Sequence, residues 1–181
     1  MSNILILFST TDGQAFKICQ KIQSDLQIFG HSVSLLPVVG AGQEDLGGFD
    51  AVVIGASIRY GKHKPEVADF IDKHRGALSK VKTAFFSVNV VARKADKNTP
   101  ETNPYLKKFF STQNWRPDLA AVFAGKIHYQ KYRLLDRWMI RFIMFLTKGP
   151  TDPSSEVEFT DWNSVEAFGK LIAAESSKGV G

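Results

Sequence analysis

The sequence predicts an α/β fold in which five parallel strands form a doubly wound sheet. Short apolar runs alternate with longer amphipathic stretches along the 181 residues, as expected when each strand is followed by a crossover helix. Several of these runs are continuously apolar, which is typical of strands buried on both faces. No repeat or linker divides the chain, whose length suits one domain over residues 1–181.

The first strand is predicted over residues 4–8, which read Ile-Leu-Ile-Leu-Phe. A helix over 14–29 follows, because its apolar residues recur at helical spacing, and Gly30 is a natural stop. Residues 32–36 alternate as a second strand that Pro37 ends.

The remaining strands are predicted over 51–55, 82–91 and 118–124. The helices are predicted over 65–78, where Pro65 stands in the first turn, over 104–112, and over 161–175 with Thr160 or Asp161 as N-cap. Right-handed crossovers bring the carboxyl ends of parallel strands to one edge, where a ligand crevice is expected.

Composition excludes several classes of site and segment. The single cysteine, Cys19, rules out an internal disulfide framework and a multi-cysteine metal site, so no metal is predicted. No secretory signal is visible, and no stretch reaches the ~18 uncharged apolar residues of a membrane-spanning helix. We therefore expect a protein that does not cross a membrane.

The loop after the first strand reads Ser-Thr-Thr-Asp-Gly-Gln over residues 9–14. Hydroxyls, a glycine and free backbone N–H groups at a helix N-terminus predict a site for a phosphate dianion. The loop is neither a Walker A motif nor a Gly-x-Gly-x-x-Gly motif. A polar turn with a Ser/Thr cap is the alternative interpretation.

This loop resembles the FMN-phosphate signature of flavodoxins, with Phe8, Thr10 and Gly13 at the aromatic, hydroxyl and small positions. Two positions depart from the signature. Ala15 lacks the usual final hydroxyl, and Asp12 adds a negative charge near the phosphate. The aspartate is therefore expected to turn outward or to cap the backbone.

Further blocks extend the resemblance over residues 4 to about 170. They are Gly55-Ala56-Ser57-Ile58-Arg59-Tyr60-Gly61, Ser87-Val88-Asn89-Val90-Val91-Ala92-Arg93-Lys94, Thr102-Asn103 with Tyr105, Trp115-Arg116-Pro117-Asp118, Tyr132-Arg133, Asp136-Arg137 with Met139-Ile140, and Thr160-Asp161-Trp162. Together with the first loop, they resemble the quinone-dependent protoporphyrinogen IX dehydrogenases, the flavodoxin-like bacterial kind.

The resemblance implies one non-covalent FMN. Its phosphate is expected on Thr10, Thr11, Asp12, Gly13, Gln14 and Ala15. Its isoalloxazine is expected between two loops, made of Ser57, Ile58, Arg59, Tyr60 and Gly61 on one side and Ser87, Val88, Asn89, Val90 and Val91 on the other. Tyr60 would stack on the flavin, or else be a surface tyrosine in a glycine-flanked turn. Either Asn89 or backbone groups of its loop would bind the pyrimidine edge.

A long basic insertion, about residues 126–158, follows the fifth strand. Residues 126–148 hold six Lys or Arg against one acid, a charge of +5 that equals the net charge of the whole chain. Arg133, Arg137 and Arg141 recur every four residues, as on one stripe of a helix. The opposite side carries Leu135, Trp138, Met139, Phe142, Ile143, Phe145 and Leu146.

Such a helix fits a membrane interface, where arginines meet headgroups and rings enter the acyl boundary. The membrane contacts would be Arg133, Arg137, Trp138, Arg141, Phe142 and Phe145. Core packing or dimerisation is the alternative. The resemblance favours the membrane, because it implies a quinone dissolved in the bilayer, menaquinone or ubiquinone, and a peripheral protein on the cytoplasmic side of the cell membrane.

The resemblance implies oxidation of protoporphyrinogen IX to protoporphyrin IX in haem biosynthesis. In each of three rounds the substrate loses a hydride from a bridging carbon and a proton from a pyrrole nitrogen. Arg59, Arg93, Lys94 and Lys126 are candidates to pair with its two propionates, or are surface charges. No general base is predicted, although His63 and His128 stand near the expected crevice.

Three other classes of protein are alternatives to this enzyme. An electron carrier usually presents an acidic docking face, whereas this chain is basic. An NAD(P)H-dependent quinone reductase of the same fold stays an alternative. A nucleic-acid-binding module is disfavoured, because the arginines are interleaved with long aliphatic side chains.

Overall fold

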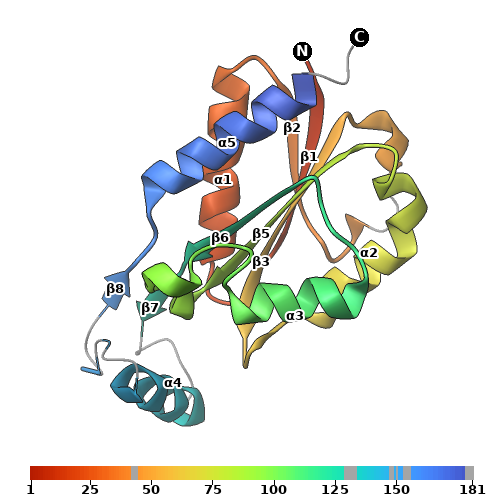
Figure 1. Cartoon of the computed structure of the whole chain (residues 1–181). Coiled ribbons are helices and arrows are strands. Elements are labelled where there is room, and N and C mark those ends of the chain that lie inside the picture. Colours follow the sequence, from red (N-terminus) through yellow and green to blue (C-terminus); the bar gives the residue numbers. More distant parts are fainter. Residues whose placement is uncertain (42–44, 129–133, 147–148, 150, 153–155, 178–181) are drawn as a thin grey trace.

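The computed structural model describes residues 1–41, 45–128, 134–146, 149, 151–152 and 156–177. Its main sheet has five parallel strands in the order β2-β1-β3-β5-β6 (Figure 1). The strands are β1 (Asn3–Ser9), β2 (Ser32–Pro37), β3 (Ala51–Arg59), β5 (Lys82–Asn89) and β6 (Leu119–Ala124). The expected α/β fold with a parallel sheet is therefore confirmed.

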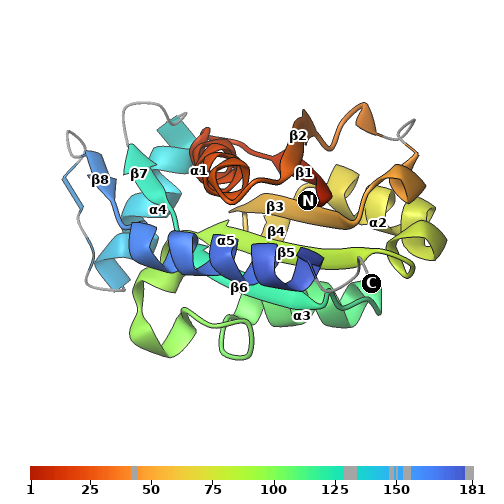
Figure 2. The ribbon, with the colours of Figure 1, turned by 90° about the horizontal axis from the view of Figure 1, so that it is seen from above.

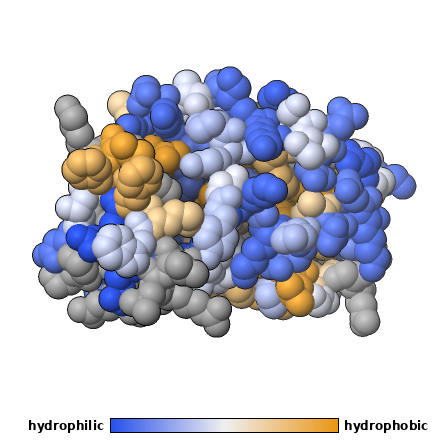
Figure 3. Space-filling model, turned by 90° about the horizontal axis from the view of Figure 1, so that it is seen from below, coloured by the Kyte–Doolittle hydropathy of each residue, from blue (hydrophilic) through white to orange (hydrophobic). Residues whose placement is uncertain are grey.

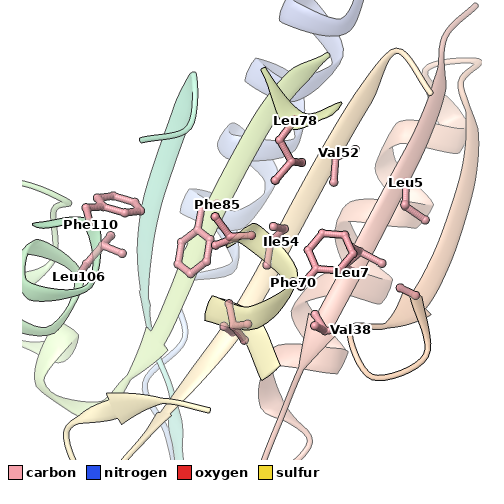
Figure 4. Close-up of a cluster of buried hydrophobic side chains, with 14 of the residues drawn as sticks. Leu5, Leu7, Val38, Val52, Ile54, Phe70, Leu78, Phe85, Leu106 and Phe110 are labelled. Carbon is pink, nitrogen blue, oxygen red and sulfur yellow. The ribbon is translucent and has the colours of Figure 1, made fainter. Parts of the chain in front are cut away.

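Helices cover both faces of the sheet (Figure 1 and Figure 2). One face carries α1 (Gln14–Ile28) and α5 (Trp162–Ser177), and the other carries α2 (Pro65–Leu78) and α3 (Pro104–Gln113). Alternate residues of each strand enter the two cores, so Ile4 and Ile6 face α1 while Leu5 and Leu7 face α2. Figure 4 shows the second of these cores.

The predicted boundaries shift by more than one residue at two strands. The strand expected over 82–91 ends at Asn89, because the Asn89 side chain accepts a hydrogen bond from Ala92 N and caps a short 3₁₀ helix, η3 (Val90–Arg93). The strand expected over 51–55 continues to Arg59 and pairs with the short β4 (Lys62–His63). Two further 3₁₀ turns are η2 (Leu46–Gly48) and η4 (Ala95–Lys97).

The insertion forms three elements beyond the carboxyl edge of the sheet (Figure 1). Strands β7 (Lys126–His128) and β8 (Glu156–Glu158) pair antiparallel, and helix α4 (Leu134–Leu146) lies between them in the sequence. Within the described ranges, no helix is both long and apolar enough to cross a bilayer.

Candidate functional site

A cleft of about 360 Å³ opens at the carboxyl edge of the sheet. Its walls come from the two loops that follow β1 and β5, from the β3–β4 turn, and from the insertion. The lining residues are Asp12, Gln14, Ser57, Ile58, Arg59, Tyr60, Gly61, Val88, Asn89, Val90, Val91, Tyr105, Gly125, Lys126, Met139, Ile140 and Met144. The volume is at the lower end of the ~300–1,000 Å³ typical of small-molecule sites, enough for one ring system.

The loop after β1 wraps the N-terminus of α1. Gly13 adopts a left-handed φ of 85°, which a side chain would strain, and its N–H donates to Thr10 Oγ1 at 3.0 Å. Lys17 N donates the first helical hydrogen bond to Gly13 O. The N–H groups of residues 14–16 precede that bond and have no helical acceptor, so this turn offers donors to an anion.

The Asp12 side chain forms an ion pair with Arg59. Its Oδ2 lies 3.3 Å from Arg59 Nη1, and the Arg59 guanidinium lies 5.4 Å from the centroid of the Tyr60 ring. The negative charge in the loop is therefore paired with a cation from the neighbouring strand. Ala15, the other departure from the flavodoxin signature, is fully buried in the core beneath the loop.

Tyr60 and Gly61 form a tight turn between β3 and β4. Both residues have positive φ, 50° and 74°, as a two-residue hairpin turn of type I′ requires. A tyrosine at positive φ is strained, and such strain tends to persist at functional sites. The turn presents the Tyr60 ring at the cleft with 62% of the residue exposed.

A buried polar network supports the second loop. Asn103 Nδ2 donates to Asn89 Oδ1 at 3.2 Å, and Asn89 Nδ2 donates to Ser87 Oγ at 3.4 Å. Ser87 Oγ also lies 3.0 Å from His63 Nε2. The Asn89 side chain is therefore engaged in internal hydrogen bonds, which leaves the backbone of its loop to face the cleft.

His63 is buried between Phe85 and Phe109. Burial lowers the pKa of His63 to about 3, because the apolar surroundings disfavour the charged imidazole. The ring is neutral at physiological pH and is not among the residues that line the cleft. It acts as a structural partner of Ser87 rather than as the general base sought at this site.

Helix α4 closes one side of the cleft through Met139, Ile140 and Met144. Met144 is fully buried against Ile127, with Ile140 and Phe159 beside it. Ile140 and Met144, which were not among the apolar residues predicted opposite the arginines, therefore form an apolar stripe that faces inward. The Arg141 guanidinium lies 5.6 Å from the Trp138 ring centroid.

Comparisons with known proteins agree with this geometry. The sequence profile described as "Flavodoxin domain" matches residues 5–154. The chain is 44% identical over 174 residues to the protoporphyrinogen IX dehydrogenase [quinone] of Escherichia coli K12, covering 96% of both chains. It is 39% identical to the Leishmania major protein of the same name, covering 94% of this chain and 74% of that one.

The chain belongs to the quinone-dependent protoporphyrinogen IX dehydrogenase family. Its fold is also that of solved flavodoxins. The two-electron reduced flavodoxin of Megasphaera elsdenii superposes with a TM-score of 0.58 at 10% identity, covering 94% of this chain and 98% of that chain. The flavodoxin domain implies a flavin cofactor.

The residues present fit a flavin in this family member. The first turn of α1 offers N–H donors for a phosphate, and the cleft beside it has mostly apolar walls for a flat ring. Among the residues proposed for the ring, all but Ser87 line the cleft. Ser87 is fully buried in the network below it.

The predicted substrate contacts fall into two groups. Arg59 and Lys126 line the cleft, whereas Arg93 and Lys94 do not. The Arg93 guanidinium donates to Val90 O at 3.2 Å and lies 5.9 Å from the centroid of the Phe159 ring, so it ties η3 to the insertion. Arg93 and Lys94 therefore stay predictions as substrate contacts.

The predicted site residues and the residues that line the cleft do not match completely. Arg133 and the side chain of His128 lie outside the described residues. Tyr105, Gly125, Met139, Ile140 and Met144 line the cleft but were not predicted to do so from the sequence. Only the resemblance blocks, which contain Tyr105, Met139 and Ile140, gave a signal for any of them. In the described part of the chain, no cluster of His, Cys, Asp or Glu could hold a metal ion.

Proposed function

We propose that the protein binds FMN and oxidises protoporphyrinogen IX to protoporphyrin IX, with a membrane quinone, menaquinone or ubiquinone, as electron acceptor. The observation that carries the proposal is the cleft at the carboxyl edge, in a chain 44% identical to a protoporphyrinogen IX dehydrogenase over nearly its full length. Three rounds remove six electrons and six protons in total, and three quinones leave as quinols.

FMN is favoured over a dinucleotide flavin by the phosphate loop. Residues 9–14 offer one helix N-terminus for one phosphate and lack the glycine pattern of dinucleotide sites. Thr10, Gly13 and the N–H groups of residues 14–16 would hold that phosphate. The loops at 57–61 and 88–91 would hold the ring.

When bound, the flavin supplies two-electron oxidation of the substrate and electron transfer to the quinone. The chain positions the reactants. Tyr60 and Tyr105 flank the cleft, while Met139, Ile140 and Met144 of α4 keep water from one side of it. Among the described residues that line the cleft none is a histidine, and we propose that protons released from the pyrrole nitrogens pass to water at the cleft mouth.

The outward face of α4 supports membrane association. Trp138, Phe142 and Phe145 are 68%, 62% and 73% exposed, and apolar side chains gather on the surface at this edge (Figure 3). Arg137 and Arg141 flank them on the same helix. We place this face in the acyl boundary of the cytoplasmic leaflet, with the cleft mouth close to the quinone.

The deciding experiment is anaerobic reduction of the flavin. Protoporphyrinogen IX added to the FMN-loaded protein should bleach the oxidised flavin band, and a soluble quinone should restore it. Reduction by NADH but not by protoporphyrinogen would instead establish an NAD(P)H-dependent quinone reductase. Reduction by neither, with an artificial reductant still effective, would indicate an electron carrier.

Membrane association is tested by flotation with liposomes containing anionic lipid. Changing Trp138, Phe142 and Phe145 together to serine should release the protein and leave its FMN content unchanged, because these side chains point away from the core. Ile28→Ser is the matched control, since Ile28 is 77% exposed at the far end of α1. Equal binding of the triple variant and the control would contradict the α4 assignment.

A further inference from the structure

We infer that Arg59 and Lys126 form a two-point carboxylate site at the cleft, which selects a flat apolar substrate carrying two carboxylates. The inference rests on the proposed function and assigns the residues that recognise the propionates. Of the basic residues that the structure describes, these two line the cleft.

Arg59 occupies one wall, at the end of β3. Its side chain forms an ion pair with Asp12 at 3.3 Å and lies over the Tyr60 ring. A guanidinium held in one orientation loses little entropy when it binds a carboxylate, and its geometry allows two parallel hydrogen bonds. The Asp12 carboxylate already occupies the position that such a ligand would take.

Lys126 occupies the opposite wall, at the start of β7. Its ammonium forms an ion pair with Glu156 on β8. In the register of the two strands, Lys126 is paired with a different residue, Glu158. Both cations therefore have a carboxylate partner near the cleft. A substrate carboxylate would replace Asp12 at one cation and Glu156 at the other.

The backbone positions of the two cations suit a tetrapyrrole. Arg59 ends β3, and Lys126 follows β6, which lies two strands away in the sheet. Two strand spacings between backbones are about 10 Å, a distance that the long Arg and Lys side chains and two flexible propionates on neighbouring pyrroles can span together. The cleft walls between the cations are apolar or aromatic, from Ile58, Tyr60, Tyr105 and Met139, and would hold the flavin ring, so the substrate would lie over that ring at the cleft mouth.

Because substrate carboxylates would replace Asp12 and Glu156 as ion-pair partners, the site selects substrates by their charge. An uncharged ring would leave both internal ion pairs intact and gain only apolar contact. A dicarboxylate would replace both internal pairs, and Asp12 and Glu156, half exposed at the rim, would then be solvated by water. The internal carboxylates therefore compete with the substrate, and removing one should strengthen binding.

The test measures steady-state kinetics with protoporphyrinogen IX and binding of two porphyrins, protoporphyrin IX and its dimethyl ester. Arg59→Gln and Lys126→Gln should each raise KM for protoporphyrinogen about tenfold and weaken binding of the free acid, with binding of the diester unchanged. FMN content should be unchanged in Lys126→Gln, and it is measured alongside in Arg59→Gln because Arg59 also lies in the loop proposed to hold the flavin ring. Glu156→Gln should lower KM, because Lys126 loses its competitor. Lys107→Gln, at an exposed site on α3, is the control.

Three results would overturn the inference. One is equal affinity of the wild-type protein for the acid and the diester. Another is an unchanged KM in Arg59→Gln and Lys126→Gln while turnover of protoporphyrinogen persists, a result that leaves the proposed function intact. The third is loss of FMN from Arg59→Gln with porphyrin binding unaltered, which would assign Arg59 to the cofactor. Failure of the proposed function appears separately, as no bleaching of the wild-type flavin.

Discussion

Glu158 on β8 forms an ion pair with Lys17 on α1, in which Lys17 Nζ lies 3.1 Å from Glu158 Oε2. Glu158 Oε1 also accepts hydrogen bonds from Gln14 Nε2 at 3.2 Å and Trp162 Nε1 at 2.9 Å. Gln14 is the first residue of α1, so one carboxylate joins the N-terminus of α1, the end of the insertion and the start of α5. The insertion is thereby fixed to the first turn of α1.

Glu158→Gln should destabilise the fold in a pH-dependent way. Burial alone would raise the pKa of Glu158, but hydrogen bonds from Lys17, Gln14 and Trp162 and the charge of Lys17 together lower it. A lowered pKa gives stability that is present above the unfolded value of about 4.3 and is lost as pH falls through the folded value. Lys17 is more than half exposed, so the loss at pH 7 is about 0.5–1 kcal/mol.

Urea denaturation of the wild type and Glu158→Gln at pH 7 and pH 3 measures this difference. The gap between the two proteins should shrink at pH 3. Glu101→Gln, at an exposed position, is the matched control. A gap of constant size at both pH values would mean that the hydrogen bonds, rather than the charge of Glu158, stabilise this contact.

Asn103→Ala should destabilise the protein by about 2–4 kcal/mol. Asn103 is fully buried. Its Oδ1 caps α3 by accepting hydrogen bonds from Tyr105 N and Leu106 N. Its Nδ2 donates to Asn89 Oδ1 and Lys97 O. Loss of the cap costs ~1 kcal/mol, and loss of the two hydrogen bonds that Nδ2 donates costs ~0.5–1.5 kcal/mol each, although Asn89 Oδ1 keeps its bond from Ala92 N.

Asn103→Asp separates these two roles, because a carboxylate can still cap α3 but cannot donate to Asn89. Thermal or urea denaturation should place this variant at or below Asn103→Ala, since the carboxylate would face the Asn89 oxygen. Wild-type stability in Asn103→Asp would show that the helix cap alone matters.

The sheet and its edge follow from the sequence, whereas contacts between distant residues do not. Continuous apolar runs such as residues 4–8 mark buried strands, and the polar loops after them must lie at the carboxyl edge. The pairing of Asn89 with Asn103 joins two loops with no local signal. The orientation of helix α4 could not be predicted either, because a wide apolar stripe does not show that Met144 faces inward while Phe142 faces outward.

Tyr60→Gly should be more stable than Tyr60→Ala by about 1 kcal/mol. Both changes delete the ring, but at φ 50° alanine bears the left-handed strain of an L-residue and glycine does not. The two variants should lose flavin affinity equally if the ring stacks on the cofactor, while Tyr60→Phe should retain it. Denaturation of the apoproteins and FMN titration measure the two effects. Equal stability of the glycine and alanine variants would mean that the turn relaxes away from the left-handed conformation.

His63→Gln should remove a steep pH dependence of stability between about pH 6.5 and pH 3. Because burial lowers the pKa of His63 to about 3, the unfolded chain takes up a proton below pH 6.5 that the folded protein does not. Stability must therefore fall as pH falls through this range, by about 1.4 kcal/mol per pH unit well below pH 6.5.

Glutamine keeps a donor for Ser87 Oγ but does not titrate. Between pH 7 and pH 5 the wild type should lose about 2 kcal/mol more stability than His63→Gln in urea denaturation. Parallel stability curves would show that the His63 imidazole takes up its proton in the folded state at an ordinary pH. In that case the kinetic pH profile becomes decisive: an inflection near pH 6–7 that is lost in His63→Gln would return His63 to consideration as the proton acceptor, 3.0 Å from Ser87 beneath the flavin loop.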